Sequence, residues 1–304
     1  MKKLDIARLV TTIVYSLSVI LLTVSVVQPA HAAEVPTART TYAFLNVNSQ
    51  EYTVGLKVDG YDMTWATGSG SSRKYIRAQR VANFLKTEVR SSVVALTECD
   101  TQMGADLAHL MGPSWKFLGG ERSAHNKNGW LYDGDKWSQA QTLTVTQLPG
   151  SQGRRLLQTG LARRGVPGPN PVLQMATTHY SSGDPESRDA QHAAVMKKIG
   201  GGVRLLSADT NALSFPNGRL NDETVTAPRW VLERLGWEDY GRGVPSFHNY
   251  SKLDPGWPID TIAASPNAQK TDAIDVTWSG SVDTRGKGIS DHMALTVGVE
   301  FHTP

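Results

Sequence analysis

The sequence predicts a folded α/β protein in which mixed sheets are covered by helices. Short apolar runs typical of strands recur from Thr40 onward, and segments with helical spacing lie between them. Several of the strand-like runs follow one another closely, as hairpin strands do, which favours mixed sheets. With 39% hydrophobic residues, 19% charged residues and eight tryptophans, the composition is that of a globular chain rather than a disordered one.

Ten strands are expected, and ten strands in one domain imply a large sheet or two. The apolar runs span residues 42–47, 93–97, 129–132, 143–148, 156–162, 172–179, 203–208, 259–264, 274–278 and 293–299. Helical spacing covers residues 76–89, 105–111, 190–199 and 228–235, with Ser72 as the expected N-cap of the first helix. Residues 63–72 and 244–258 are rich in Gly, Ser or Pro and are expected to form surface loops.

The first 33 residues have the form of a secretory signal peptide. Three basic residues precede an apolar stretch at residues 9–27, and small residues follow at the expected cleavage site near Ala32 and Ala33. An uncleaved membrane anchor is the alternative, because the apolar stretch is nearly long enough to span a bilayer. We therefore expect a signal peptide at residues 1–33, a single domain at residues 34–304, and a secreted, extracellular protein.

Cysteine usage and net charge allow few conclusions about function. Cys99 is the only cysteine, so no intramolecular disulfide can form. Its side chain is expected to pack in the interior rather than to act as a nucleophile. Removal of residues 1–32 takes away three basic residues and one acidic residue, which lowers the formal net charge from +3 to +1. A near-neutral chain neither favours nor excludes a nucleic-acid partner, because local patches decide such binding.

Polar side chains stand at the ends of four predicted strands. Taken singly, each has an ordinary explanation as a solvated acid, a turn-forming residue or a hydrogen-bonded histidine. Together they favour an active site presented from rigid strand ends. The residues concerned are Glu98, His179, Asp209, Asn211, Asp291 and His292.

These motifs resemble those of the endonuclease/exonuclease/phosphatase superfamily, the deoxyribonuclease I-like fold group. Ser290-Asp291-His292 is identical to the terminal Ser-Asp-His motif of the family, and Leu96-Thr97-Glu98 is similar to its Leu-Gln-Glu motif. The resemblance runs from about residue 42 to the C-terminus. The other matching positions are Asn46 in the first strand, His179 in Thr178-His179-Tyr180, Arg188 and Gln191 in an Arg-x-x-Gln helix, Asp209 and Asn211 in the counterpart of Gly-Asp-Phe-Asn, and Asp260 in Ile259-Asp260-Thr261-Ile262.

The resemblance implies a fold and a reaction class. The fold is a four-layer α/β/β/α sandwich in which two mixed, mainly antiparallel sheets pack face to face and helices cover both outer faces. The reaction is hydrolysis of a phosphate ester by a catalytic domain that uses a divalent cation, Mg²⁺ first, with Mn²⁺ or Ca²⁺ as alternatives. Hard cations prefer oxygen ligands, and the expected ligands are Asn46, Glu98 and Asp291.

The resemblance also implies a role for each remaining site residue. His292 is the expected general base, because an imidazole with an ordinary pKa near 6.5 accepts a proton from water near neutral pH. Asp260 would orient that ring and stabilise the imidazolium. His179 would contact a phosphoryl oxygen or assist the leaving oxygen, while Asp209 and Asn211 would hold the nucleophile and stabilise the pentacovalent state. Water would then attack phosphorus in line.

Departures from the family motifs concern the neighbours of these residues. Thr97, Tyr180, Ala208 and Thr210 replace the residues usual in the family, and every titrating group is retained. The chemistry is therefore expected to be intact, while the substrate preference is left open. Serine-hydrolase and zincin chemistries are disfavoured, because the chain contains neither Gly-x-Ser-x-Gly nor His-Glu-x-x-His.

Nucleic acid is the substrate expected first. Seven basic residues would form a rim around a phosphodiester backbone, unless they are ordinary solvated surface charges. They are Arg154, Arg155, Arg163 and Arg164, which flank one predicted hairpin, with Arg122, Lys127 and Arg188.

Two other interpretations stay open. A phospholipid phosphodiesterase of the sphingomyelinase type, or a phosphomonoesterase, is the alternative, because aromatic residues between His248 and Trp257 would either touch a membrane lipid or pack their own loop. A catalytically inactive binding module on the same fold is the third interpretation. No obligate protein partner is predicted.

Overall fold

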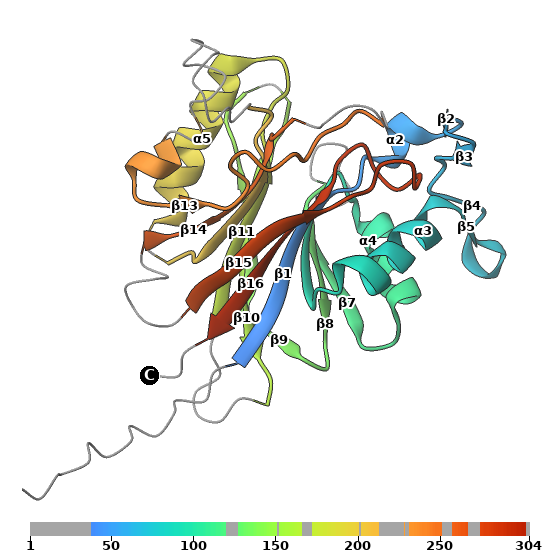
Figure 1. Ribbon diagram of the computed structural model, residues 1–304, viewed down its shortest axis with the longest axis horizontal. Coiled ribbons are helices and arrows are strands. Elements are labelled where there is room, and N and C mark those ends of the chain that lie inside the picture. Colours follow the sequence, from blue (N-terminus) through green and yellow to red (C-terminus); the bar gives the residue numbers. More distant parts are fainter. Residues whose placement is uncertain are drawn as a thin grey trace, which may run out of the picture. The chain divides into compact units, whose positions relative to one another are not determined.

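Two six-stranded sheets form the centre of the protein (Figure 1). The strand order is β15-β16-β1-β6-β8-β7 in the first sheet and β13-β14-β12-β11-β10-β9 in the second. The strands of the first sheet are β1 (Ala38–Asn46), β6 (Val93–Thr97), β7 (Trp115–Gly119), β8 (Gly129–Asp133), β15 (Ile274–Val282) and β16 (Ala294–Phe301). The strands of the second sheet are β9 (Trp137–Gln147), β10 (Arg155–Arg163), β11 (Val172–His179), β12 (Leu205–Asp209), β13 (Glu238–Asp239) and β14 (Asp260–Ala264).

This computed structural model describes residues 38–119, 127–150, 152–165, 172–200, 202–212, 228, 231–250, 257–266 and 274–301. The predicted signal peptide at residues 1–33 lies outside them. Residues Pro36–Pro304 form one compact unit by their internal contacts. Among the described residues, every helix is too short or too polar to cross a membrane.

Each sheet contains one parallel pair of strands. β1 pairs with β6 in parallel, and β11 pairs with β12 in parallel, whereas all other neighbours in the two sheets are antiparallel. The parallel pairs bring the carboxyl ends of β1 and β6, and those of β11 and β12, to the same edge of their sheets. The prediction of mixed, mainly antiparallel sheets is confirmed.

The inner faces of the two sheets pack against each other. Successive side chains of a strand point to opposite faces, so alternate apolar residues of β1 and β10 enter this inner core. Tyr42 and Phe44 lie there from β1, and Leu157 and Leu161 from β10, all fully buried. The Tyr42 hydroxyl and the Ser207 Oγ are 2.7 Å apart, which joins the sheets by a buried hydrogen bond.

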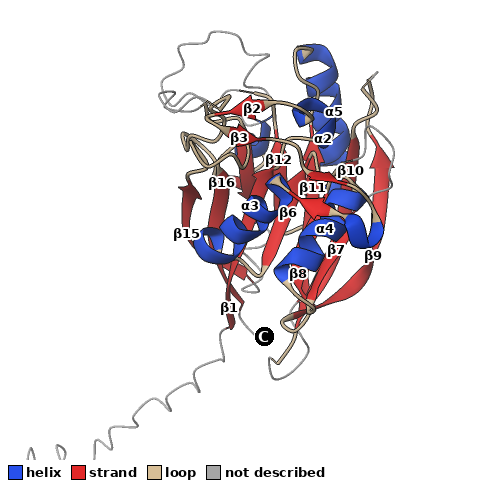
Figure 2. Ribbon diagram, turned by 90° about the vertical axis from the view of Figure 1, so that its right-hand side faces the viewer, coloured by secondary structure: helices blue, strands red, loops and turns tan. Residues whose placement is uncertain are grey.

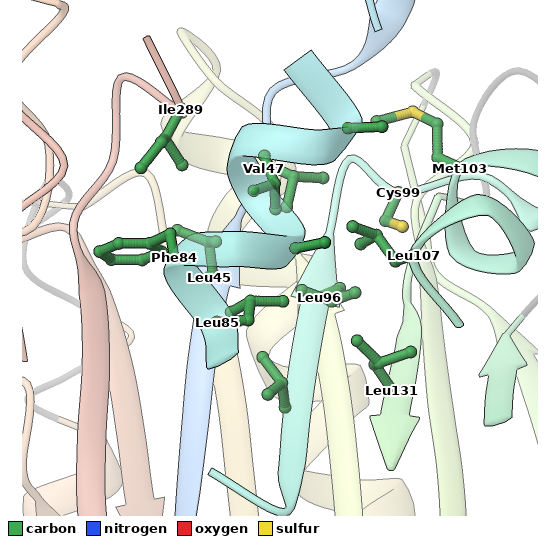
Figure 3. Packing of buried hydrophobic residues seen from close by; sticks show 14 of the residues in the cluster. Leu45, Val47, Phe84, Leu85, Leu96, Cys99, Met103, Leu107, Leu131 and Ile289 are labelled. Atoms are coloured by element: carbon green, nitrogen blue, oxygen red, sulfur yellow. The ribbon is translucent and has the colours of Figure 1, made fainter. Parts of the chain in front are cut away.

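Helices cover the two outer faces. α3 (Arg77–Phe84) and α4 (Thr101–Met111) lie across the first sheet, as Figure 2 shows, and pack apolar side chains onto it (Figure 3). α5 (Pro185–Ile199) covers the second sheet through Val195 and Ile199. The four layers confirm the predicted sandwich. The apolar side chains between α3, α4 and the first sheet form an outer core. Cys99 is buried in this outer core under α4, so it packs as predicted, and burial raises the pKa of its thiol well above the ordinary value.

The segment between β1 and α3 differs from its prediction. It contains α2 (Gln50–Thr53), a 3-10 turn at Gly70–Ser72, and the short strands β2 (Lys57–Val58), β3 (Tyr61–Asp62), β4 (Ala66–Thr67) and β5 (Lys74–Tyr75). Within the predicted surface loop, Trp65 is fully buried. Ser72 is not the N-cap of α3, because the β4–β5 pair intervenes and the N–H groups of Arg77 and Ala78 donate to the carbonyls of Thr64 and Trp65 instead.

The other helix boundaries have local causes. The side chains of Asp100 and Asp184 cap α4 and α5 by accepting hydrogen bonds from backbone N–H groups, and Pro185 occupies the first turn of α5. α3 ends in a π-helical turn at Leu85–Val89. Of the predicted helix at residues 228–235, the structure describes residues 228 and 231–234 as helical.

All ten predicted strands are present. β7, β13 and the first half of β9 were not predicted. All three are edge strands, and the side chains of β9 are largely exposed and polar, so it lacks the apolar alternation of an inner strand.

His192 on α5 makes the stability of this fold sensitive to acid. Its Nδ1 lies 3.0 Å from the Tyr180 hydroxyl, and burial lowers its pKa to about 4. The folded state therefore holds a neutral ring that the unfolded chain protonates below about pH 6.5. The free energy of unfolding should fall as the pH drops from about 6.5 towards 4, by on the order of 3 kcal/mol from this group.

We expect His192→Gln to remove much of that acid loss in urea unfolding curves recorded at pH 7 and pH 4.5. His109→Gln, at an exposed position on α4, is the matched control and should keep it. The same acid loss in wild type and His192→Gln would contradict the assignment.

Candidate active site

Three predicted site residues lie side by side on neighbouring strands of the second sheet. His179 is the last residue of β11, Asp209 the last of β12, and Asp260 the first of β14. The strand register pairs His179 with Asp209 and Asp209 with Asp260. The His179 Nε2 is 3.3 Å from the Asp209 Oδ2. The register of the sheet therefore places an imidazole and two carboxylates in one row.

The first sheet brings Asn46 and Glu98 to the same place. Asn46 ends β1 opposite Thr97, and Glu98 follows at the end of β6. The Asn46 Nδ2 donates to the Asp209 Oδ2 at 2.9 Å and to the Glu98 Oε1 at 3.3 Å, so one amide connects the carboxylates of both sheets. The strand ends of the two sheets thus converge, as the sequence predicted.

His292 and Asp260 form a buried pair across the two sheets. The His292 Nδ1 lies 2.7 Å from the Asp260 Oδ2, and its Nε2 lies 3.8 Å from the Asp209 Oδ2. Burial alone would lower the pKa of His292, but the hydrogen-bonded Asp260, together with Asp291 and Asp209, raises that pKa to about 10. Asp260 therefore stabilises the imidazolium form and fixes the ring so that Nε2 faces Asp209.

His179 is held in the opposite protonation state. Burial lowers its pKa to about 3, which the Asp209 charge opposes and the charges of Arg154 and His292 reinforce. Its Nδ1 is 3.8 Å from the Glu98 Oε1. A neutral His179 thus stands between Glu98 and Asp209, beside a histidine that holds its proton. Two imidazoles with such different proton affinities suit separate roles in one reaction.

Asp209 is almost fully buried at 2% exposure, and burial raises its pKa. Its Oδ1 accepts from the backbone N–H of Asn211 at 3.0 Å. The Asn211 side chain donates to the Tyr180 carbonyl at 2.9 Å, and its own carbonyl accepts from Arg188 at 2.7 Å. Asn211 therefore shapes the turn after β12, and its backbone rather than its side chain contacts Asp209.

Left-handed backbone marks three of the strand ends. Asn48, Glu98 and Asn211 have φ values of 52°, 55° and 48°. Asparagine tolerates this conformation, whereas glutamate seldom adopts it. At Glu98 the turn aims the carboxylate at the site, where Oε2 accepts from the Ser49 N–H at 2.8 Å. One fifth of that side chain is exposed, so the carboxylate can reach a bound ligand.

The predicted cation ligands do not all have the predicted orientation. The Asn46 Oδ1 accepts from the Asn48 N–H at 2.9 Å in a turn of the Asx type, so the amide nitrogen, not the oxygen, faces the carboxylates. Asp291 accepts from the Ser290 Oγ at 3.3 Å, and among the described residues no hydrogen bond or ion pair joins it to Glu98 or Asp209.

The donor set nevertheless fits an oxygen-preferring cation. Asp209, Asp260 and His292 offer ligand atoms within 4.8 Å of one another, but Asp260 and His292 are bound to each other at 2.7 Å. Glu98 and Asp209 are the carboxylates that remain, and a buried carboxylate such as Asp209 favours a nearby positive charge. The residues present therefore suit an oxygen-preferring cation, which Glu98 and Asp209 would hold.

Two residues have contacts in the site beyond the places that sequence reasoning assigned to them, Ser290 in its motif and Arg154 in the basic rim. Ser290 Oγ donates to the Asn46 carbonyl at 2.5 Å and accepts from the His292 N–H at 3.1 Å, so the serine of Ser-Asp-His connects the ends of the motif to β1. Arg154 is largely buried, which lowers its pKa, while the charges of Asp209 and Glu98 act in the opposite direction. Its guanidinium donates to the Gln152 Oε1 at 3.3 and 3.2 Å and lies within electrostatic reach of both carboxylates.

The predicted basic rim is only partly assembled. Arg154 lies beside the site, and Lys127 binds Ser49 and Glu51 next to it. Arg163 and Arg164 lie at the far end of β10, roughly 26 Å from the first residue of the strand at the usual rise per residue, and pack near Trp137. The prediction that grouped them with Arg154 was wrong, because Arg154 precedes β10 whereas Arg163 and Arg164 lie at its other end. Arg122 lies outside the described residues.

The predicted aromatic loop is divided between the site and the surface. The Tyr250 hydroxyl accepts from the Asn48 side chain at 2.8 Å, and His248 is buried at 1% exposure. Trp257 is 48% exposed, and residues 251–256 lie outside the described residues. Tyr250 therefore supports the turn after β1, whereas the His248 N–H donates to the Asp291 carbonyl at 2.9 Å.

Known structures share this architecture. An endonuclease/exonuclease/phosphatase family protein from Bacteroides thetaiotaomicron superposes with a TM-score of 0.64 at 15% identity, covering 88% of this chain and 96% of that one. A mannosyl-6-phosphatase from the same organism gives 0.62 at 15% identity, covering 86% and 99%. TDP2 from D. rerio, solved with a single-strand DNA product, gives 0.59 at 16% identity, covering 86% and 99%.

No protein-family model and no curated protein sequence matches the chain. The similarity is thus one of fold, and it agrees with the family that the sequence motifs resemble. The chain has the fold of the endonuclease/exonuclease/phosphatase proteins.

Proposed function

We propose that this protein is a secreted, divalent-cation-dependent phosphoesterase that cleaves phosphodiester bonds in nucleic acid. The single observation that carries the proposal is the convergence of Glu98, His179, Asp209 and the Asp260–His292 pair at the strand ends of two facing sheets. The neighbours in fold include a phosphatase and a protein bound to DNA, which supports phosphoester chemistry.

We propose a part for each group in water attack on phosphorus. Asp209 accepts hydrogen bonds from its surroundings and, with the Asn211 backbone beside it, would hold the attacking water. His292, in its neutral form, would take up the proton of that water at Nε2, with Asp260 stabilising the imidazolium that forms. Because the neighbouring carboxylates raise the pKa of His292 to about 10, this role needs the positive charge of a cation at Glu98 and Asp209 to lower that pKa. Neutral His179 would donate a hydrogen bond to a phosphoryl oxygen, and Arg154 would offset the charge that develops there.

Glu98 and Asp209 would hold the cation. A divalent ion at these carboxylates supplies positive charge that stabilises the phosphoryl oxygens and lowers the pKa of nearby histidines. The Asn46 amide keeps the two carboxylates at a fixed separation by donating to both.

Nucleic acid is favoured as the substrate by the charges around the site. Arg154 and Lys127 lie at its margin, and repeated phosphates attract such groups. The substrate test is cleavage of plasmid DNA, RNA, sphingomyelin and a phosphomonoester by the mature chain, each with Mg²⁺ and with chelator. We expect Mg²⁺-dependent cleavage of nucleic acid, and Glu98→Gln should require a higher Mg²⁺ concentration for half-maximal rate.

Cleavage of lipid or of the monoester alone would overturn the nucleic-acid assignment while keeping phosphoester chemistry. Full activity in the presence of chelator would contradict the proposed requirement for a divalent cation. No turnover on any substrate of the panel would point to an inactive binding module.

Both histidines should be essential to turnover. We expect His292→Ala and His179→Ala each to lower kcat by about 10²- to 10⁴-fold, because each removes a group that acts on a transferred proton or a developing charge. Asp260→Asn should resemble His292→Ala, since it loses the ring orientation and the stabilised imidazolium. Far-ultraviolet circular dichroism checks folding, and exposed His109→Ala is the control. Near-normal turnover of either site variant would sink its assignment.

Arg154 should contribute to substrate binding in proportion to phosphate charge. We expect Arg154→Gln to lower kcat/KM on nucleic acid and to reduce the slope of log affinity against log salt concentration by about one unit. Arg163→Gln, at the far end of β10, is the matched control and should leave that slope unchanged. Equal salt slopes in wild type and Arg154→Gln would show that Arg154 touches no phosphate.

A further inference from the structure

A fully buried arginine lies directly behind the active site. Arg77 is the first residue of α3 and has 0% exposure. Among the described residues no carboxylate pairs with it, and its buried Nε has no hydrogen-bond partner. Burying a charge without an opposite charge costs several kcal/mol, so apolar packing alone does not explain an arginine here.

All the hydrogen bonds of its guanidinium go to two turns of the active site. We define the first turn as residues 46–48, after β1, and the last turn as residues 289–292, before β16. The Nη1 donates to the Val47 carbonyl at 2.8 Å and to the Ile289 carbonyl at 3.4 Å, and the Nη2 donates to the Asn48 carbonyl at 2.6 Å. One planar group thus binds both turns, which are about 240 residues apart in the sequence.

The two turns and Arg77 are each held in place by further contacts. The side chains of Val47 and Ile289 pack into the outer core beneath α3, where Figure 3 shows them near Phe84 and Leu45. The guanidinium lies 5.2 Å from the centre of the Trp65 ring, whose Nε1 donates to Asp106 at 3.0 Å. The contact with Trp65 therefore holds the guanidinium in place independently of its hydrogen bonds to the turns.

The two turns carry both halves of the catalytic arrangement. The first turn positions Asn46, which donates to Glu98 and Asp209, and the last turn positions His292, which is bound to Asp260. Ser290 joins the turns once, through the Asn46 carbonyl. A single hydrogen bond permits rotation about it, whereas the fork of Arg77 adds three further contacts in one plane.

We infer that Arg77 is a positioning residue that sets the distance between the first and last turns, and so aligns the carboxylate side of the site with the His292 side. This role rests on the proposed function for its effect on turnover, but not for its effect on the turns. Lysine would keep the charge and lose the planar fork, so it separates alignment from electrostatics.

The test compares wild type with Arg77→Lys, Arg77→Met and Val81→Ala. Val81 lies on the same helix in the same outer core and contacts neither turn through hydrogen bonds, so Val81→Ala reproduces a loss of stability alone. Steady-state kinetics are measured well below the unfolding midpoint of every variant. Hydrogen–deuterium exchange is followed by mass spectrometry in peptides covering the first turn, the last turn and the inner strand β12.

We expect Arg77→Lys to lower kcat by about 10- to 100-fold with little change in KM, because small displacements of aligned groups are costly. Exchange should rise in both turns together and not in β12. Val81→Ala should lower the unfolding midpoint without either effect, and Arg77→Met should behave like Arg77→Lys if it folds.

Unchanged kcat and unchanged exchange in Arg77→Lys would overturn the inference, and so would a rise confined to one turn. A wild-type chain without phosphoester turnover would instead sink the proposed function, and the exchange comparison would still decide the positioning role.

Discussion

The packing of the two sheets against each other is the constraint on which the site depends. The inner core fixes how β1 of one sheet lies relative to β12 of the other, and the Tyr42–Ser207 hydrogen bond joins these two strands within it. Once that relation is set, strand register does the rest. Asn46 reaches Asp209 across the interface because both stand at the ends of strands whose inner side chains already interlock.

Burial determines the electrostatics of the site as well as its geometry. Asp209, Asp260 and both histidines are almost completely removed from solvent, so neighbouring charges act on one another with little screening. The two histidines diverge for this reason. His292 has a carboxylate on its Nδ1 and a raised pKa, whereas desolvation, with the charges of Arg154 and His292 acting in the same direction, lowers the pKa of His179.

Much of this arrangement could be predicted from the sequence. Apolar runs ending in polar residues located β6, β11 and β12 within a few residues, because inner strands carry a strong hydrophobic signal. The signal is absent in edge strand β9, whose outer half is polar. Motifs identified Glu98, His179, Asp209 and His292, but a motif does not state which atom of Asn46 faces its neighbours. That depends on the Asx turn with Asn48, which only the folded backbone reveals.

Long-range contacts were equally hidden from sequence reasoning. Arg77 looks like one polar residue on an amphipathic helix, and its partners are backbone carbonyls that any residue would offer. Arg154 stands next to Arg155 in the sequence, yet only its position just before β10 brings it within electrostatic reach of Glu98 and Asp209. Charge counting along the chain cannot distinguish it from Arg163 at the other end of the same strand.

The backbone of Glu98 has a consequence for how this protein can change over time. A left-handed glutamate is less stable than a glycine would be at that position by on the order of 1 kcal/mol. Selection for stability alone would therefore replace it, and selection for a carboxylate at the strand end opposes that replacement. Stability and activity therefore make opposite demands at this position. In a descendant that no longer needed catalysis, a change from glutamate to glycine here would raise stability without a cost to function.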